Sequence, residues 1–129
     1  AIADYTKAIE ISSDYAEYGS VYKYRGSCKN ELEDYVGGLA DLNKAIDLNP
    51  NDFDAINRRG TSKQGLKDFY GAIADYTEVI ASDPDDPMAY YNRAVAKYRL
   101  RDYDGACKDV QKAVELGAKG GMLLANACK

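Results

Sequence analysis

One stretch of this chain returns at a fixed interval, and that repetition constrains the possible fold more than any other feature. Residues 68–80, DFYGAIADYTEVI, reappear with substitutions as 102–114, DYDGACKDVQKAV, and as 34–46, DYVGGLADLNKAI, each 34 residues away. A shorter copy, AIADYTKAI, occupies residues 1–9. A fixed period of this length is typical of repeat proteins, in which each unit buries its apolar face by stacking on its neighbours. The sequence therefore predicts a stacked array of similar units.

Within each copy the residues predict two helices separated by a short polar turn. In that turn an Asp stands directly before an aromatic residue, where its carboxylate can accept the free backbone N–H groups of a new helix. These residues are Asp34, Asp68 and Asp102. The pattern predicts first helices over 22–32, 54–66 and 88–100, and second helices over 35–48, 69–81 and 103–116. The fold class we predict is all-α, an α-solenoid of antiparallel helix pairs.

The two ends of the chain are less regular. Residues 1–11 carry one apolar helix face, and the segment after them is three residues longer than in the other copies. That insertion either lets the next helix begin near Asp14 or forms a loop before a helix that starts near Ser20. After the last second helix no proline follows, so glycine is expected to stop it in a left-handed cap.

These signals divide the chain into a series of repeats within one domain. The chain begins inside a repeat, which predicts that it comes from a longer protein. The predicted parts are a half-repeat and linker over 1–18, full repeats over 19–52, 53–86 and 87–120, and a short capping helix over 121–129.

The residues at fixed places in the period resemble the tetratricopeptide repeat (TPR), whose pattern is W-x2-L-G-x2-Y, then A-x3-F, then Pro. Its small position on the first helix holds Gly26, Gly60 and Ala94. Its small position on the second helix holds Gly38, Ala72 and Ala106, followed four residues later by Leu42, Tyr76 and Val110. The resemblance covers essentially the whole chain. It implies a right-handed superhelix whose first helices line a concave, peptide-binding groove.

Two departures from that pattern recur in every full repeat. Arg25, Arg59 and Arg93 stand where the family has Leu, and Lys29, Lys63 and Lys97 stand where it has Tyr. An acid follows each Arg sixteen residues later, at Asp41, Asp75 and Asp109. Since these places lie opposite each other in an antiparallel pair, we predict a partly buried Arg–Asp ion pair in each repeat, with a structural role.

The resemblance places the ligand-binding surface on the first helices. Amide and guanidinium donors with phenol rings between them suit the carbonyls and alternating side chains of an extended peptide. We therefore interpret the chain as a non-catalytic module that binds another protein or a peptide segment in the groove. The alternative is a structural spacer or a self-assembling segment that forms homo-oligomers. The candidate peptide-binding residues are Lys23, Tyr24, Ser27, Asn57, Arg58, Thr61, Tyr91, Asn92, Val95, Tyr98 and Arg99.

One subset of the family holds a C-terminal carboxylate in a clamp of Lys and Asn residues on successive first helices. In this chain Ser27 stands one turn after Lys23 where the clamp needs Asn. Arg58 replaces another Asn, and Met88 stands where a Lys is needed. The clamp is incomplete, so we do not expect a chaperone-tail adaptor of that kind.

Charge and composition argue against several other classes of protein. The net charge is −4 and no run of Lys or Arg is present, which argues against nucleic acid as the main partner. No apolar run approaches the roughly 20 residues that span a bilayer, so we expect no membrane insertion. No nucleophile has a base beside it in the sequence, and we expect no enzyme, metal or cofactor. The compartment stays open.

The cysteines and tyrosines are interpreted first as packing residues. Cys28, Cys107 and Cys128 form no Cys-x-x-Cys pattern and the chain has no His, so they are expected to be small buried side chains, with a disulfide left open. Six tyrosines fall on packing positions, where the ring fills the core and the hydroxyl reaches its edge. They are Tyr5, Tyr22, Tyr35, Tyr76, Tyr90 and Tyr103.

Overall fold

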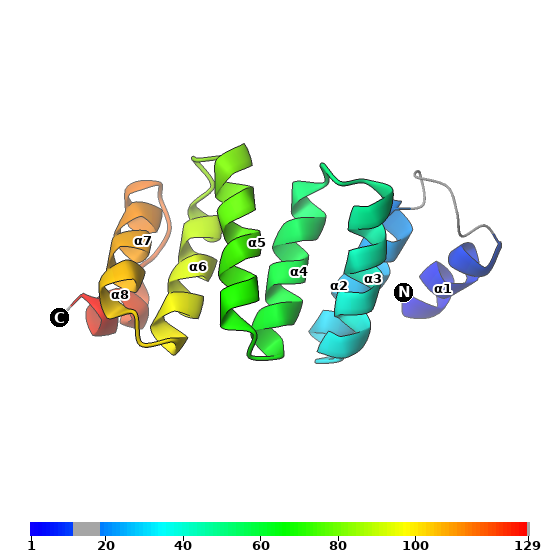
Figure 1. The fold of residues 1–129 in the computed structure, drawn as a ribbon, viewed down its shortest axis with the longest axis horizontal. Helices are drawn as coiled ribbons and strands as arrows, with labels where there is room; N and C mark the ends of the chain where they lie inside the picture. Colours follow the sequence, from blue (N-terminus) through cyan, green and yellow to red (C-terminus); the bar gives the residue numbers. More distant parts are fainter. Residues whose placement is uncertain (12–18, 129) are drawn as a thin grey trace. The chain divides into compact units, whose positions relative to one another are not determined.

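The computed structural model describes residues 1–11 and 19–128, and every regular element in them is an α-helix (Figure 1). The chain divides into two compact units, Ala1–Lys67 and Asp68–Lys129. The six paired helices agree with the predicted ranges to within one turn. The prediction that the helix after the insertion begins near Asp14 falls on residues that the structure does not describe. The first unit holds α1 (Ile2–Ile11), α2 (Gly19–Glu31), α3 (Tyr35–Leu48) and α4 (Phe53–Gly65), and the second holds α5 (Phe69–Ser82), α6 (Pro87–Arg99), α7 (Tyr103–Glu115) and α8 (Gly121–Ala127).

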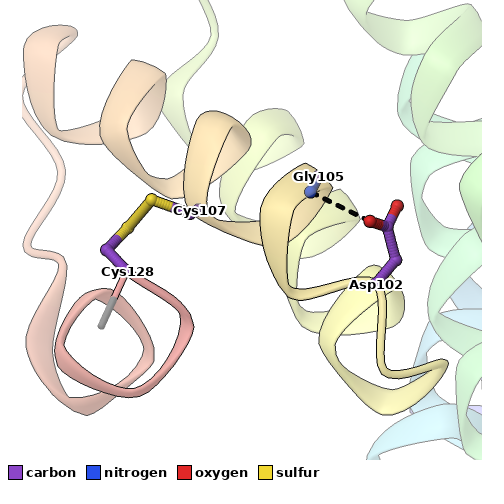
Figure 2. Close-up of a disulfide and its surroundings, with 4 residues drawn as sticks. All are labelled: Asp102, Gly105, Cys107 and Cys128. Atoms are coloured by element: carbon purple, nitrogen blue, oxygen red, sulfur yellow. Dashed lines mark hydrogen bonds between the residues drawn. A yellow bond between two sulfur atoms is a disulfide. The ribbon is translucent and has the colours of Figure 1, made fainter.

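The predicted aspartate caps begin the second helices. Each carboxylate accepts a hydrogen bond from a glycine N–H three residues later, at 3.0 Å, in the pairs Asp34–Gly37, Asp68–Gly71 and Asp102–Gly105. Figure 2 shows the last of these bonds. A side chain at the glycine would collide with the capping carboxylate, so the repeated Asp-x-x-Gly spacing is part of the cap. Asp86 caps α6 in the same way through Met88 N–H, with Pro87 as the first helical residue.

The helix ends use left-handed residues, as predicted for glycine after α7. Gly117 has φ +108°, its N–H donates to Val114 O at 3.0 Å, and Ala118 N–H donates to Ala113 O at 2.9 Å. This pair of bonds is the Schellman arrangement. In the turns after the first helices the same place is held by Glu33, Lys67 and Arg101, with φ of 63°, 65° and 64°. A side chain there costs about 1 kcal/mol relative to glycine.

Each unit has its own apolar core, built where small residues let helices approach. In the first unit, a Cβ added to Gly26 of α2 would lie 2.9 Å from Leu42 Cγ and 3.1 Å from the Gly38 carbonyl oxygen of α3. In the second unit Ala94 of α6 and Ala106 of α7 are fully buried. The buried clusters are Tyr22, Leu42, Ala45 and Ala55 in the first unit, and Ala72, Tyr76 and Ala96 in the second.

A disulfide joins Cys107 of α7 to Cys128, the residue that follows α8 (Figure 2). The first interpretation of the cysteines is therefore wrong for these two, and the alternative that was left open holds. The sequence did not reveal the pair because the turn after α7 brings α8 back against it across a separation of 21 residues. Cys28 is a free, half-buried thiol. No helix in the described part of the chain is long and apolar enough to cross a bilayer.

Candidate functional site

The structure contains a predicted Arg–Asp pair within each compact unit. Arg25 holds Asp41 with two bonds, Nε to Oδ2 at 2.7 Å and Nη2 to Oδ1 at 2.5 Å, and Lys29 Nζ lies 3.1 Å from Asp41 Oδ2. One carboxylate thus serves two cations. A planar guanidinium matches the carboxylate fork, which fixes the register of α2 on α3 as well as neutralising the buried charge.

The second unit repeats this cluster between α6 and α7. Arg93 donates from Nε and Nη2 to the two oxygens of Asp109, both at 2.7 Å, and Lys97 Nζ lies 2.9 Å from Asp109 Oδ2. The hydrogen bond to Asp109 raises the pKa of the Arg93 guanidinium above its usual value, against the opposing effect of burial. Two hydrogen bonds to Asp109 thus hold the guanidinium within the helix pair.

Each of these arginines also reaches the second helix of the preceding copy, a contact that the sequence reasoning missed. Arg25 Nη1 donates to Thr6 Oγ1 at 3.2 Å, and Arg93 Nη1 donates to Thr77 Oγ1 at 3.3 Å. In the first unit Arg59 Nη1 donates to Asn43 Oδ1 at 3.2 Å. The acceptor always stands two residues after the repeated Asp, which is the signal that could have found it.

The number of residues between each of these arginines and its acceptor is larger where the chain has the insertion near its start. Arg59 and Arg93 reach acceptors sixteen residues earlier, whereas Arg25 reaches one nineteen residues earlier. The difference equals the three inserted residues, so the insertion leaves the contact between α1 and α2 in place. Arg59 and Asp75 belong to different compact units, and their pairing stays a prediction.

In the first unit the candidate binding surface centres on Arg58 of α4. Its Nε donates to Asp54 Oδ2 at 3.1 Å, and its Nη1 donates to Ser27 Oγ of α2 at 2.5 Å. The guanidinium also lies 5.6 Å from the centre of the Tyr24 ring. Three contacts from two helices therefore hold the guanidinium of a side chain that is still 35% exposed.

Tyr24 is the exposed aromatic residue of this surface. Its ring is 41% exposed and stacks on Tyr5 of α1 with the ring centres 6.1 Å apart. Lys23 Nζ lies 5.0 Å from the same ring. Amphipathic rings flanked by cations are typical of interaction surfaces, because they bury area without losing much side-chain freedom.

Lys23, by contrast, already forms ion pairs within the first unit. Its ammonium lies 3.0 Å from Asp52 and 3.5 Å from Asp54, and its side chain is 11% exposed. Burial lowers the pKa of Lys23, but the hydrogen bond to Asp52 and the charges of Asp52 and Asp54 outweigh it, so the pKa is raised. Lys23 therefore positions the start of α4 more than it presents a charge to a ligand.

Beside Arg58 an open hollow of about 200 Å³ lies between α2 and α4. The buried Asn30 closes its base by donating to Arg58 O at 3.2 Å and accepting from Ser62 Oγ at 2.8 Å. Asn57 has a buried Oδ1 with no hydrogen-bond partner among the described residues, whereas Thr61 is exposed. The hollow is lined by Ser27, Asn30, Glu31, Arg58 and Thr61.

In the second unit the predicted binding residues lie on α6. Tyr91, Asn92, Val95 and Tyr98 are half-buried and Arg99 is exposed. The Arg99 guanidinium lies 5.0 Å from the centre of the Phe69 ring on α5. Tyr98 meets Tyr103 of α7 edge to face, with the ring centres 5.2 Å apart. The prediction that Tyr103 belongs to the core is wrong, because its side chain is 44% exposed at the first turn of α7.

The comparisons with known proteins agree with this architecture. The family model described as Tetratricopeptide repeat matches residues 57–120. Protein unc-45 homolog B of Homo sapiens is 33% identical over 58 residues, which make up 45% of this chain and 6% of that protein. The chain thus spans a small fraction of the length of this relative.

Two solved structures have a closely similar fold. YrrB, described as a TPR protein with an unusual peptide-binding site, superposes with a TM-score of 0.85 at 23% identity, covering 98% of this chain and 63% of that one. The first TPR of Spaghetti (RPAP3), bound to the HSP90 peptide SRMEEVD, superposes with a TM-score of 0.82 at 22% identity, covering 88% and 92%. The two solved structures share the fold of this chain, and the family match together with the repeated helix pairs shows that the chain belongs to the tetratricopeptide repeat family.

Proposed function

We propose that this chain is a protein-interaction module that holds an extended segment of another protein against its first helices. The observation that carries the proposal is the arrangement around Arg58, which Asp54 and Ser27 hold beside the exposed Tyr24 ring. A guanidinium fixed in this way loses little conformational freedom when a ligand oxygen binds it. Arg and Tyr are also the residue types that contribute most at protein interfaces.

An extended peptide fits the chemistry of this surface better than a compact small molecule does. The hollow beside Arg58 is open and small, and amide, hydroxyl and guanidinium groups line it. Such groups pair with backbone carbonyls and polar side chains. A cofactor site would be a deeper, mostly apolar pocket. The variable first-helix residues then select the side chains of the bound segment.

The bound Spaghetti domain supports peptide binding on this fold but not the same peptide for this chain. The incomplete carboxylate clamp is one reason. The second reason is that Asp52 and Asp54 already neutralise Lys23, which leaves it little attraction for a terminal carboxylate. We therefore propose that the partner is recognised along an internal segment rather than through its C-terminus.

A displayed library of random peptides of about a dozen residues tests the proposal directly. Peptides selected on the wild-type chain are measured against the double variant Arg58→Glu, Tyr91→Ala, with helix content followed by circular dichroism. We expect at least about a tenfold loss of affinity, the effect of 1.4 kcal/mol. If no peptide is selected, or if the selected peptides bind the folded double variant as tightly as wild type, the proposal fails.

Lys44→Glu is the matched control, because it reverses a charge in the same unit on the second helix α3. Binding to this variant should stay within about twofold of wild type, since the charge lies off the first helices. Light scattering over a range of concentrations tests the alternative of self-assembly. A mass that stays monomeric at every concentration excludes that alternative, whereas growth with concentration supports it.

A further inference from the structure

A second pocket lies among α6, α7 and α8, apart from the hollow beside Arg58. Its volume is about 490 Å³, which is within the range of ligand pockets in proteins. All its walls belong to the second compact unit. They are Tyr98 of α6, Tyr103 and Asp104 of α7, and Asn126 and Ala127 of α8.

The pocket combines two aromatic rings with a carboxylate that pairs with no cation in the part of the chain that the structure describes. Tyr98 and Tyr103 meet edge to face, which leaves ring surface of the exposed Tyr103 open to a ligand. Asp104 is exposed at the first turn of α7, and no cation in the described residues pairs with it. Lys108, one turn further along α7, lines a neighbouring hollow that shares Asp104 and Ala127 with this pocket, but it forms no ion pair with Asp104.

We infer that this pocket receives the side chain of a Lys or Arg residue from the bound protein segment. A cation over a tyrosine ring gains about 0.5–1 kcal/mol at an exposed site. An ion pair with a carboxylate adds up to about the same amount. The buried Ala127 offers an apolar contact for the methylene stem, and the Asn126 amide oxygen can accept from the charged head.

The inference rests on the proposed function, because it names the ligand chemistry for one part of the predicted binding surface. An anionic side chain is disfavoured at this pocket, since it would meet Asp104. A neutral apolar side chain would form no ion pair with that carboxylate and no hydrogen bond with the Asn126 amide. The pocket thus calls for a basic residue, whereas the hollow beside Arg58 calls for an oxygen acceptor.

The disulfide explains how such a short helix can form a pocket wall. Cys128 directly follows Ala127, so the bond to Cys107 fixes the wall residues of α8 against α7 (Figure 2). A helix of seven residues is too short to be stable by itself in water. The covalent link holds Asn126 and Ala127 in place without a larger apolar interface.

Two short peptides that differ in one group provide the test. Acetyl-Gly-Arg-Gly-amide is titrated into the isotope-labelled chain and compared with the same peptide carrying citrulline, which has nearly the same shape but no charge. We expect backbone amide shifts at Asp104 and Asn126, with affinity at least about fivefold weaker for citrulline, the effect of roughly 1 kcal/mol. Equal affinities would overturn the inference, because recognition would not depend on the cation.

Variants then locate the effect. Asp104→Asn should weaken binding of the arginine peptide by about fivefold, whereas Glu115→Gln should leave it within about twofold. Glu115 is the matched control, since it is an exposed carboxylate at the far end of α7. An unchanged affinity in Asp104→Asn, or an equal loss in both variants, would show that no charge-specific pocket exists.

This result is separate from the test of the proposed function. If Arg58→Glu, Tyr91→Ala abolishes capture of selected peptides while the arginine and citrulline peptides bind equally, the module stands and the basic-residue pocket is wrong. If the arginine peptide binds the Asp104 pocket selectively but no library peptide is captured, the pocket stands and peptide capture along the first helices is wrong.

Discussion

The two compact units share almost the same internal ion cluster but present different binding surfaces. In the first unit Arg25 and Lys29 converge on Asp41, and in the second unit Arg93 and Lys97 converge on Asp109 with nearly equal distances. The first unit presents a guanidinium beside an exposed ring, whereas the second presents an exposed carboxylate in a pocket that two tyrosine rings also line.

This difference separates the residues of a repeat that stabilise the fold from those that are available to bind a ligand. The repeated Arg, Lys and Asp satisfy one another inside the helix pair, and a buried charge must be satisfied wherever the pair occurs. Solvent-exposed charged residues on the first helices do not need a partner of opposite charge within the repeat. They can therefore change from copy to copy, and the two units present candidate binding groups of opposite charge.

Loss of one member of an internal cluster should have the largest effect on stability. Arg93→Ala leaves Asp109 buried with Lys97 as its main partner, and we expect the free energy of unfolding to fall by about 3 kcal/mol. Denaturant unfolding followed by circular dichroism measures it, with Lys108→Ala as an exposed control. Arg25→Ala should cost about the same in the first unit; unchanged midpoints in Arg93→Ala and Asp109→Ala would contradict a stabilising pair.

Removing the disulfide should distinguish the second unit from the first. Cys107→Ser with Cys128→Ser opens a loop with a sequence separation of 21 residues, which the chain-entropy model values at roughly 3 kcal/mol as an upper figure. Hydrogen exchange should show α8 amides losing protection while α3 amides keep theirs. Equal protection of α8 with and without the bond would mean that packing alone holds this helix. Cys28→Ser is the control.

The aspartate caps should contribute equally in both units. Asp34→Ala and Asp102→Ala each remove the acceptor for one glycine N–H, and each should lower the free energy of unfolding by about 1 kcal/mol. Thermal unfolding of the two variants, together with Asp85→Ala as a turn aspartate that caps no helix, measures this effect. A cost confined to one unit would show that the caps are not equivalent.

The smallest effects should come from the left-handed turns, and their sign should depend on the residue. Arg101→Gly removes steric strain at φ +64° but increases the freedom of the unfolded chain, so we expect a gain below about 1 kcal/mol. Gly117→Ala introduces strain at φ +108° and should lose about 1 kcal/mol. Unfolding midpoints that move in the same direction for both variants would contradict this account.

Much of the fold could be predicted because it depends on local, repeated signals. The helix ranges follow from the spacing of apolar residues, and the caps follow from Asp residues placed directly before each second helix. The Arg25–Asp41 and Arg93–Asp109 contacts follow from the antiparallel geometry of one pair, since a fixed spacing in sequence becomes a fixed spacing in space.

The candidate binding surface was harder to predict because side chains compete for the same partners. Lys23 and Arg58 both belong to the predicted surface, and both pair with Asp54. Their surroundings decide that the Lys23 side chain is nearly buried, whereas the Arg58 side chain stays partly exposed. The acceptors Thr6 and Thr77 were missed because the prediction considered one helix pair at a time. Tyr103 was misplaced because no local pattern specifies how much of its ring the neighbouring helices cover.

The repeat, its helix pairs, their caps and the Arg–Asp pairs could be predicted from the residues alone, since each depends on side chains within one period of the chain. The exposure of each cation, the bond between Cys107 and Cys128, and the pocket that α8 forms with Tyr98 and Asp104 became known only from the folded chain. The two groups of features differ in the range of the interactions that produce them. Helix signals act over a few residues, whereas charge pairing, a disulfide and a pocket require distant segments to meet at distances that no local pattern specifies.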